Sequence, residues 1–349
     1  MLICMSSGSR ERYRQDIILS LAMPKDDILQ FRYQEIWISP KALTKFDDKS
    51  LLNELALIVY IDQFSKEHNP EVIPCRFSRI VGYDKCGSTI TISLKLKEFA
   101  FASDIHNFNA QVKGFSGDTV PVWNEHKKPK GYYCVWIDSS DLSTVNHSCE
   151  LKVWESIVNQ LSKRLDFSSE KVFYLVKSMN DAVTQKKIEP VNGLYGLKAL
   201  HEYELKLYHY HPDEGKSHAY IKCETNSAYL TCLTNPKMLI NSRYDLKTYR
   251  FLTCDTPTDM QTILSIYRGE GEAEIPQLDF DLRLKIKAKK MKKVMIGIVI
   301  GAVLAAPHIS NVCSNNQYTD KVKYILGSIA VITSLIAGLL ASFNIKKGI

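Results

Sequence analysis

Two apolar stretches near the end of the chain decide its architecture: Val294–Val312, VMIGIVIGAVLAAPHISNV, and Tyr324–Phe343, YILGSIAVITSLIAGLLASF. Neither contains a charged residue. Each approaches the ~20 residues that a helix needs to cross a ~30 Å hydrocarbon core. Residues 294–349 are therefore predicted to form a transmembrane helical hairpin, and the residues before it have the length of one or two ordinary domains.

Basic residues flank this hairpin and predict its orientation. Seven lysines and arginines lie in a basic juxtamembrane segment, residues 283–293, and Lys346 and Lys347 follow the second stretch. The loop between the stretches carries only Lys321 and Lys323 against Asp320. Because basic flanks remain on the cytoplasmic side, we expect two spans in the cell inner (plasma) membrane, with both termini cytoplasmic. Asp16–Met23 is too short for a secretory signal.

The net charge of +7 comes from the C-terminal part of the chain. Residues 283–349 contain 11 basic residues and one acidic residue, whereas residues 1–282 contain 34 basic and 37 acidic residues. This balance argues against binding of nucleic acid by bulk electrostatics. It leaves room for a small basic pocket, so the expected partners are the lipid bilayer, a small anionic signal molecule or a partner protein, and further copies of the chain.

The patterning before the hairpin predicts a mainly β (α+β) cytosolic region. Leu29–Ile38, Val72–Tyr83 and Thr89–Lys97 alternate at the period of a strand, and Leu55–Ile61 is a continuous apolar run. Turn residues 84–88 predict a hairpin between the second and third alternating segments. Further strands are expected at 132–137, 171–176, 203–210, 219–224, 228–233, 247–254 and 280–286, and helices at 151–165 and, as a short one, 260–267.

These elements suggest two β-sandwich or barrel-like domains in tandem. We expect an N-terminal β-rich domain in residues 1–145 and an α/β connecting segment in 146–192, with a linker at 180–196. A second β-rich domain is expected in 193–282, immediately before the basic segment. The last strand is then expected to run into the first membrane helix with almost no slack.

Small residues recur at every fourth position of the two apolar stretches, which places them on one helix face and lets backbones approach closely. They are Gly297, Gly301 and Ala305 in the first stretch, and Ala330, Ser334, Gly338 and Ser342 in the second. Either the two helices of one chain pack on each other, or the same residues also make contacts between chains. A single hairpin is too thin to enclose a path, so a pore requires a homo-oligomer.

Two basic clusters are candidates for binding an anion, because the planar fork of arginine suits phosphate. One comprises Arg76, Arg79 and Lys85, and the other Arg243, Lys247 and Arg250, beside Tyr244 and Tyr249. The alternative is that they are solvated strand residues. His209 and His211 share a strand face and are weak metal candidates, so no metal or other cofactor is predicted.

Motifs that would indicate an enzyme are missing from the sequence. There is no G-x-x-x-x-G-K-[ST] loop, no G-x-G-x-x-G after a strand, no G-x-S-x-G and no H-E-x-x-H. The nine cysteines never form a C-x-x-C pair, and we interpret them as small core residues. We expect no enzymatic activity, with an anchored enzyme that lacks a known motif as an alternative.

A β-rich cytosolic part followed by two membrane helices rich in small residues resembles the membrane effectors of bacterial anti-phage, abortive-infection systems. The resemblance is one of architecture and implies no functional residue. It implies a soluble part that binds a signal, a nucleotide, an oligonucleotide or a partner protein, and membrane helices that then permeabilise or depolarise the inner membrane. The alternative is a membrane-anchored binding or scaffold protein without pore activity.

Overall fold

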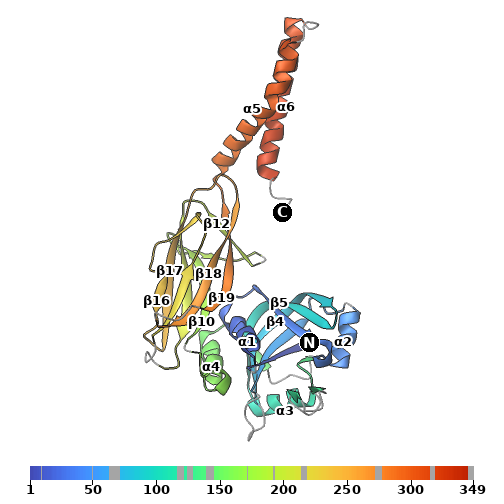
Figure 1. Cartoon of the computed structure of the whole chain (residues 1–349), viewed down its shortest axis with the longest axis vertical. Coiled ribbons are helices and arrows are strands. Elements are labelled where there is room, and N and C mark those ends of the chain that lie inside the picture. Colours follow the sequence, from blue (N-terminus) through green and yellow to red (C-terminus); the bar gives the residue numbers. More distant parts are fainter. Residues whose placement is uncertain are drawn as a thin grey trace.

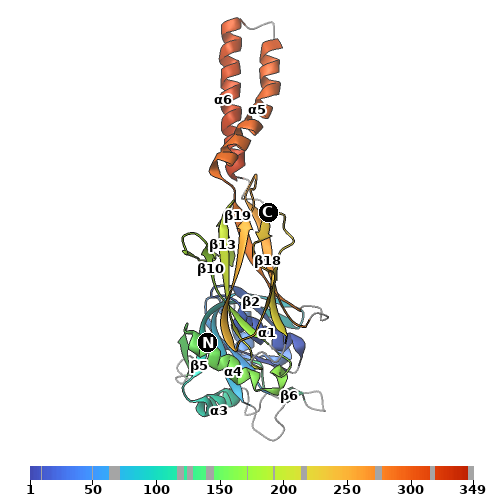
Figure 2. The same cartoon turned by 90° about the vertical axis from the view of Figure 1, so that its left-hand side faces the viewer.

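The computed structural model covers the whole chain. It describes every residue except 9, 49, 63–70, 116–121, 124–128, 139–144, 171, 192, 214–217, 272–276, 315–318 and 345–349. Side chains are also left undescribed at 113–115, 122–123, 129–130, 290–297, 313, 320 and 339–344. Strands predominate. A helix-covered sheet packs beside a β-sandwich, and two long helices project from the end of the sandwich that lies away from this sheet (Figures 1 and 2).

The N-terminal part is built on a seven-stranded sheet in the order β2-β5-β4-β3-β1-β8, with β9 paired to β5. β1 runs parallel to β3, and the other pairs are antiparallel. Gly87, with φ 59°, makes the predicted hairpin turn between β4 and β5. The strands are β1 (Leu2–Ser7), β2 (Ile28–Gln34), β3 (Leu55–Ile61), β4 (Val72–Cys86), β5 (Thr89–Ala102), β8 (Cys134–Trp136) and β9 (Val145–Ser148).

Helices cover both faces of this sheet, because the strands bury residues on both sides. One core joins the sheet to three helices, α1 (Glu11–Ala22), α2 (Pro40–Asp47) and α4 (Leu151–Ser162). The other core joins it to α3 (Ile105–Phe115) through Phe108 and Val112. The prediction of a sandwich or barrel here was wrong, since single-sequence alternation does not reveal which helices return to a sheet. The remaining elements are η1 (Glu35–Trp37), η3 (Leu165–Phe167), β6 (Val122–Trp123) and β7 (Pro129–Lys130).

The second part is a sandwich of two five-stranded sheets. The first has the order β11-β10-β13-β17-β15, and the second has the order β12-β19-β18-β14-β16. Their facing side chains form one apolar core. The strands are β10 (Phe173–Asp181), β11 (Lys187–Ile188), β12 (Leu194–Lys198), β13 (Glu202–Tyr210), β14 (Ala219–Glu224), β15 (Leu230–Cys232), β16 (Lys237–Leu239), β17 (Tyr244–Thr253), β18 (Met260–Glu270) and β19 (Gln277–Lys287).

Three expectations for the middle of the chain need correction. Residues 260–267 are strand, not helix, because β18 pairs along its length with β19. The expected linker at 180–196 contains β11 and the beginning of β12. The connecting segment 146–192 is divided: α4 packs on the N-terminal sheet, whereas β10 pairs with β13 in the sandwich.

The two parts share side chains across their junction. Phe173 and Leu175 of β10 and Tyr210 of β13 belong to the core beneath α1 and α4, and Ala22 of α1 belongs to the sandwich core. Alternate residues of β10 therefore face different cores, with Tyr174 and Val176 pointing into the sandwich. β10 therefore contributes side chains to the cores of both parts.

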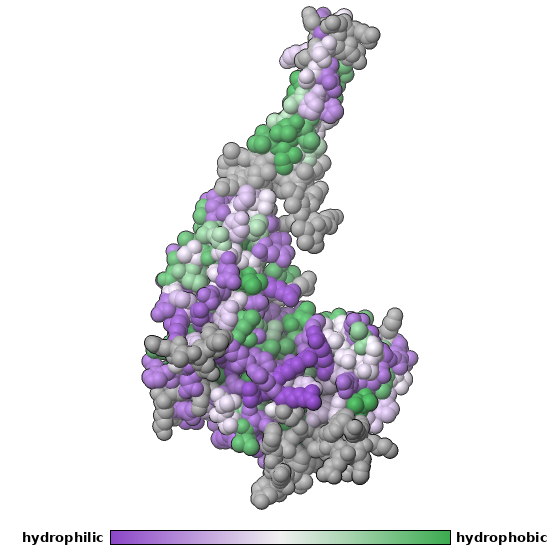
Figure 3. Space-filling view, viewed as in Figure 1, coloured by the Kyte–Doolittle hydropathy of each residue, from purple (hydrophilic) through white to green (hydrophobic). Residues whose placement is uncertain are grey.

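Two antiparallel helices, α5 (Lys290–Ser314) and α6 (Asp320–Asn344), form the C-terminal projection (Figure 2). Among the described residues, one helical segment, Lys321–Gly338, has the length and apolar composition for a membrane span, and Ile298–Val312 is a shorter apolar segment. Green, hydrophobic atoms gather on the part of the helices nearer the sandwich, and the far end is more hydrophilic (Figure 3).

Candidate functional site: the helical hairpin and its connection to the sandwich

The predicted small-residue stripes meet where α5 crosses α6. A Cβ atom added at Gly301 would lie 2.7 Å from Leu335 Cα and 2.8 Å from the Ser334 carbonyl oxygen. Ala305 and Ser334 are 3% and 8% exposed, so both lie in the same contact. Gly338 is also buried. Close backbone approach through small residues therefore holds the two helices of one chain together.

The structure places some of the remaining small and hydroxyl-bearing residues of the two helices. Gly297 and Ser342 fall outside the residues whose side chains are described. Ser334 faces α5. The hydroxyls of Ser328 and Thr333 donate to the carbonyls of Tyr324 and Ile329, each at 2.8 Å. Hydroxyls bonded in this way to the preceding turn need no further partner.

Large apolar side chains cover the outer surface of the hairpin. These exposed residues are Ile298, Val299, Val303, Leu304, Ile325, Ile329, Ile332 and Ile336. An exposed apolar surface of this kind has a high cost in water and a low one in hydrocarbon. The side chains thus divide into an inner face of small residues and an outer face suited to lipid.

β19 leads into α5 through only two residues, Ala288 and Lys289. The expectation of a strand at 280–286 that continues directly into the helix is confirmed. The connection is held to the sandwich, because the Ala288 N–H donates to Asp259 Oδ1 at 3.2 Å and the Lys287 carbonyl accepts from Ala199 N–H at 3.1 Å. The beginning of α5 is therefore tied closely to β19 and to neighbouring segments of the sandwich.

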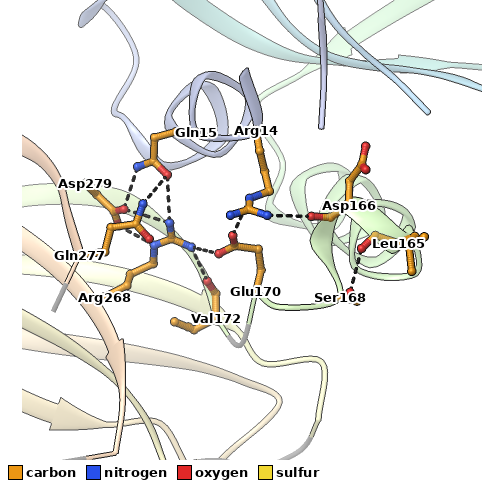
Figure 4. Close-up of polar contacts among 10 residues, drawn as sticks. All are labelled: Arg14, Gln15, Leu165, Asp166, Ser168, Glu170, Val172, Arg268, Gln277 and Asp279. Atoms are coloured by element: carbon orange, nitrogen blue, oxygen red, sulfur yellow. Dashed lines mark hydrogen bonds and ion pairs between the residues drawn. The ribbon is translucent and has the colours of Figure 1, made fainter. Parts of the chain in front are cut away.

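The other end of β19 belongs to a buried ion network at the junction with α1 (Figure 4). Arg268 of β18 donates from Nε and Nη2 to the Asp279 carboxylate of β19 at 2.6 and 3.0 Å. Its Nη1 donates to Glu170 Oε2 at 2.6 Å. The Arg268 and Asp279 residues are only 5% and 8% exposed. The network thus fixes β18, β19 and the segment before β10 to one another.

Two residues of α1 join this network. Gln15 Nε2 donates to Asp279 Oδ1 at 2.9 Å, and Arg14 Nε lies 3.0 Å from Glu170 Oε1. The N-terminal part is therefore connected by polar contacts to the strand that leads to α5 and α6. The sequence analysis missed these residues, because Arg268 finds its partner Glu170 almost 100 positions away, and no local pattern connects them.

The first predicted basic cluster is not assembled. Arg76 is 2% exposed, and its guanidinium donates to the carbonyls of Ser20, Met23 and Lys97 at 2.7, 2.6 and 2.8 Å. Burial lowers its pKa to about 10. Arg79 donates to the Asn53 carbonyl on the exposed side of β4, and Lys85 pairs with Glu35. The three side chains thus have separate partners, and the structure does not bring them together.

The second predicted cluster is also divided. Lys247 pairs with Asp245 at 3.0 Å, and the Arg250 guanidinium meets Glu204 Oε1 at 2.7 and 3.0 Å. Lys247 and Arg250, three positions apart, lie on opposite faces of β17. Arg243 lies 5.9 Å from the ring centres of both Tyr210 and Tyr244. Neighbouring carboxylates or aromatic rings therefore already accompany these cations.

The two candidate metal histidines are buried. His209 Nε2 lies 3.1 Å from the Ser242 carbonyl oxygen, and His211 Nδ1 accepts from the Asp213 N–H at 3.0 Å. Burial lowers the pKa of His209 to about 4, so its ring is neutral at physiological pH. Within the described part of the chain, no three His, Cys, Asp or Glu side chains are grouped to hold a metal ion.

The carboxyl ends of the parallel strands β1 and β3 form the usual ligand position of an open α/β sheet. Here the chain's own Asp166 fills it. Asp166 Oδ2 accepts from the Tyr60 hydroxyl at 2.5 Å, and the backbone of Gly8 also hydrogen-bonds to this carboxylate. A Cβ atom added at Gly8 would collide with Asp166. This position is therefore closed by a structural contact.

Comparison with known proteins gives no family for this chain. No family model matches it, and no curated protein matches it. Among the solved structures that resemble part of this chain is the periplasmic chaperone SfaE. It has 10% sequence identity and a TM-score of 0.20, and the match covers 27% of this chain and 55% of the chaperone. A PapD-like domain of human CEP192 has 10% identity, TM-score 0.23 and coverage of 34% and 85%. WR4, a C. elegans MSP family member, has 11% identity, TM-score 0.19 and coverage of 28% and 93%.

Proposed function

We propose that this protein is a membrane effector whose soluble part controls the α5–α6 hairpin. In this proposal both helices cross the inner membrane as a homo-oligomer, with both termini cytoplasmic. Binding of a signal to the soluble part, either a nucleotide-like small molecule or a partner protein, rearranges the helices and depolarises the membrane. A role of this kind fits the anti-phage, abortive-infection effectors that the architecture resembles.

One observation carries the proposal: the single strand β19 connects the junction with α1 to the beginning of α5. Its Asp279 accepts hydrogen bonds from Gln15 of α1 and from Arg268, and its Lys287 is separated from α5 by two residues. A ligand can change the helices only if it binds two arrangements with different affinity. A shift of α1 against the sandwich is such a change, and β19 is placed to transmit it.

The surface of the hairpin also supports the proposal. Its exposed apolar side chains require a hydrocarbon environment or a partner surface, and the lysines near α5 suit the anionic inner leaflet. Because Gly301 and Ser334 already face each other within one chain, a pore requires further copies to pack through the outer face or requires the hairpin to open. The intrachain contact is also what a simple anchor would have, so a scaffold without pore activity is the second candidate.

The test is inducible expression in bacteria with a dye that reports membrane potential. The variant is Gly301→Leu, whose side chain would meet the α6 backbone. Gly327→Leu is the matched control, because a Cβ there meets nothing within 4 Å. We expect rapid depolarisation by the wild type and by Gly327→Leu, and none by Gly301→Leu, although all three fractionate with the membrane.

The outcomes separate the two candidates. Depolarisation by wild type and control alone supports an effector that depends on the helix contact. If none of the three depolarises at high expression while all are in the membrane, the scaffold function is favoured. If Gly301→Leu depolarises as fast as the wild type, the α5–α6 contact plays no part in activity.

A further inference from the structure

A cavity of about 180 Å³ lies at the junction, lined by residues of both parts of the molecule. Lys25, Arg76 and Lys97 come from the N-terminal part, and Lys177 comes from β10 of the sandwich. Phe99, Cys149, Leu151, Leu175 and Val176 complete an apolar floor, together with one acidic residue, Glu98. The lining thus carries four cations and one carboxylate.

Arg76 is the buried group of this cavity. Its Nε and Nη1 are used by the carbonyls of Lys97, Ser20 and Met23, and its guanidinium lies 4.7 Å from the centre of the Phe99 ring. Among the described residues, Nη2 has no hydrogen-bond acceptor, and no carboxylate hydrogen-bonds to this arginine. The carboxylates of Asp27, Glu98 and Asp26 act on it electrostatically without such a bond. The guanidinium therefore has one donor edge left for an anion.

The other charges leave the cavity positive. Glu98 is engaged by Lys25 at 2.6 Å, and Lys97 is engaged by Asp26 at 2.6 Å. Lys177 is exposed and has no ion-pair partner among the described residues. Among the described residues, Arg76 and Lys177 thus remain as two cations without a hydrogen-bonded or ion-paired carboxylate, one from each side of the junction.

We propose that this cavity is a binding site for the phosphate group of a small soluble ligand. Arginine offers a forked donor edge, lysine adds charge, and the Phe99 side supplies an apolar surface. A cavity of ~150 Å³ holds a molecule the size of benzene, so the site of about 180 Å³ accepts a phosphate with a small substituent, and not an intact oligonucleotide.

The position of the site gives it a regulatory consequence, which rests on the proposed function. A phosphate held between Arg76 of β4 and Lys177 of β10 would draw the N-terminal sheet toward the sandwich. α1 contributes to both features, since Arg76 binds carbonyls at its C-terminal end and Gln15 binds Asp279 of β19. Occupation would therefore bias the same junction that leads to α5.

Cys149 lines the cavity and is exposed, which gives a direct measurement of occupancy. Full-length protein in detergent is alkylated with iodoacetamide at pH 7.5, and the modification of each cysteine is followed by peptide mass spectrometry. Cys86, exposed at the β4–β5 hairpin turn, is the internal reference. We expect inorganic phosphate in the millimolar range to slow alkylation of Cys149 about threefold or more, without changing Cys86, compared with sodium chloride at equal ionic strength.

Lys177→Glu removes the cation that belongs to the sandwich side, at an exposed position that leaves folding intact. It should raise the phosphate concentration needed for half-maximal protection about tenfold, the effect of one charged hydrogen bond. The control is Lys186→Glu, an exposed lysine at the far turn of the same sheet. This variant should be protected like the wild type.

Three results would overturn the assignment: no protection of wild-type Cys149, equal protection of Lys177→Glu, or equal protection by acetate, which would mean a general anion effect. The measurement does not use membrane potential. Its failure therefore leaves the proposed function standing with another signal site, whereas protection without any depolarisation would leave a phosphate-binding protein that is not a pore.

Discussion

The two ends of the β-sandwich are held by opposite means. At one end, α1 meets β18 and β19 through a buried network of arginine and carboxylates. At the other end, two residues lead into helices that touch through glycine, alanine and serine. The first contact has charge and direction, and it holds one geometry in water. The second has neither, and its strength depends on how closely the two backbones approach.

Under the proposed function, this difference assigns sensing to the junction and response to the hairpin. A charged network is sensitive to one missing partner, because a buried charge left alone is strongly destabilising. A contact between small residues can slide or open at modest cost, since no specific hydrogen bond is lost. We therefore expect the junction to define the resting state and the hairpin to be the element that moves.

The largest expected effect is at the junction, from Arg268→Met. The variant leaves the Asp279 and Glu170 carboxylates without their cation, and breaking a buried pair in this way costs about 3–5 kcal/mol. The free energy of unfolding, from urea titration of the protein in detergent, should fall by that amount. Lys41→Met removes an exposed pair with Asp138 and should cost less than about 1 kcal/mol. Similar losses from both variants would mean that the network does not hold the junction.

The next effect in size is in the hairpin, from Gly301→Leu. The added side chain must push the α6 backbone away, and overpacking of this kind costs about 1–3 kcal/mol. We expect the helical signal of α5 and α6 to be lost at a lower SDS fraction, with Gly301→Ala intermediate and Gly327→Leu unchanged. A graded series would confirm that distance between backbones sets the contact. Equal behaviour of Gly301→Leu and Gly327→Leu would contradict it.

The sequence predicted individual strands and the hairpin contact better than it predicted the junction between the two parts. Local patterns carry strand and helix information, so β3 and β14 were predicted with their observed bounds, and the small-residue contact of Gly301 with α6 followed from spacing alone. The junction depends on contacts between distant segments. Arg76 was selected as an anion-binding residue for its charge, and only the fold shows that it holds carbonyls of α1 and borders a cavity with Lys177.

The third test measures how the stability of the junction depends on pH. Asp27 contacts the sandwich side near Gly193, and burial raises its pKa to about 7 despite Arg76 and Arg283. The folded state therefore favours the protonated form, so this stabilisation is complete below about pH 4 and is lost as pH rises through 7. Relative to the wild type, Asp27→Asn should therefore gain unfolding free energy as pH rises from 4 to 8.

The neighbouring Asp26 supplies a control of opposite sign. Burial by itself would raise its pKa, but the ion pairs with Lys97 and Lys95 outweigh burial and lower it. Asp26→Asn should therefore match the wild type at low pH and lose stability as pH rises. If the unfolding free energies of the two variants change with pH in the same direction, the burial of Asp27 at the junction does not control its titration.

The smallest change in stability should have the clearest effect on activity. Inserting Gly-Ser-Gly-Ser between Ala288 and Lys289 leaves both the Arg268 network and the Gly301 contact in place, so unfolding should change by less than ~0.5 kcal/mol. The added slack uncouples β19 from α5, and depolarisation should then no longer follow the state of the soluble part. The same insertion after Gly87, in an exposed hairpin turn, should leave the response unchanged. If the variant at Ala288 responds like the wild type, the two ends of the sandwich communicate by a route other than β19.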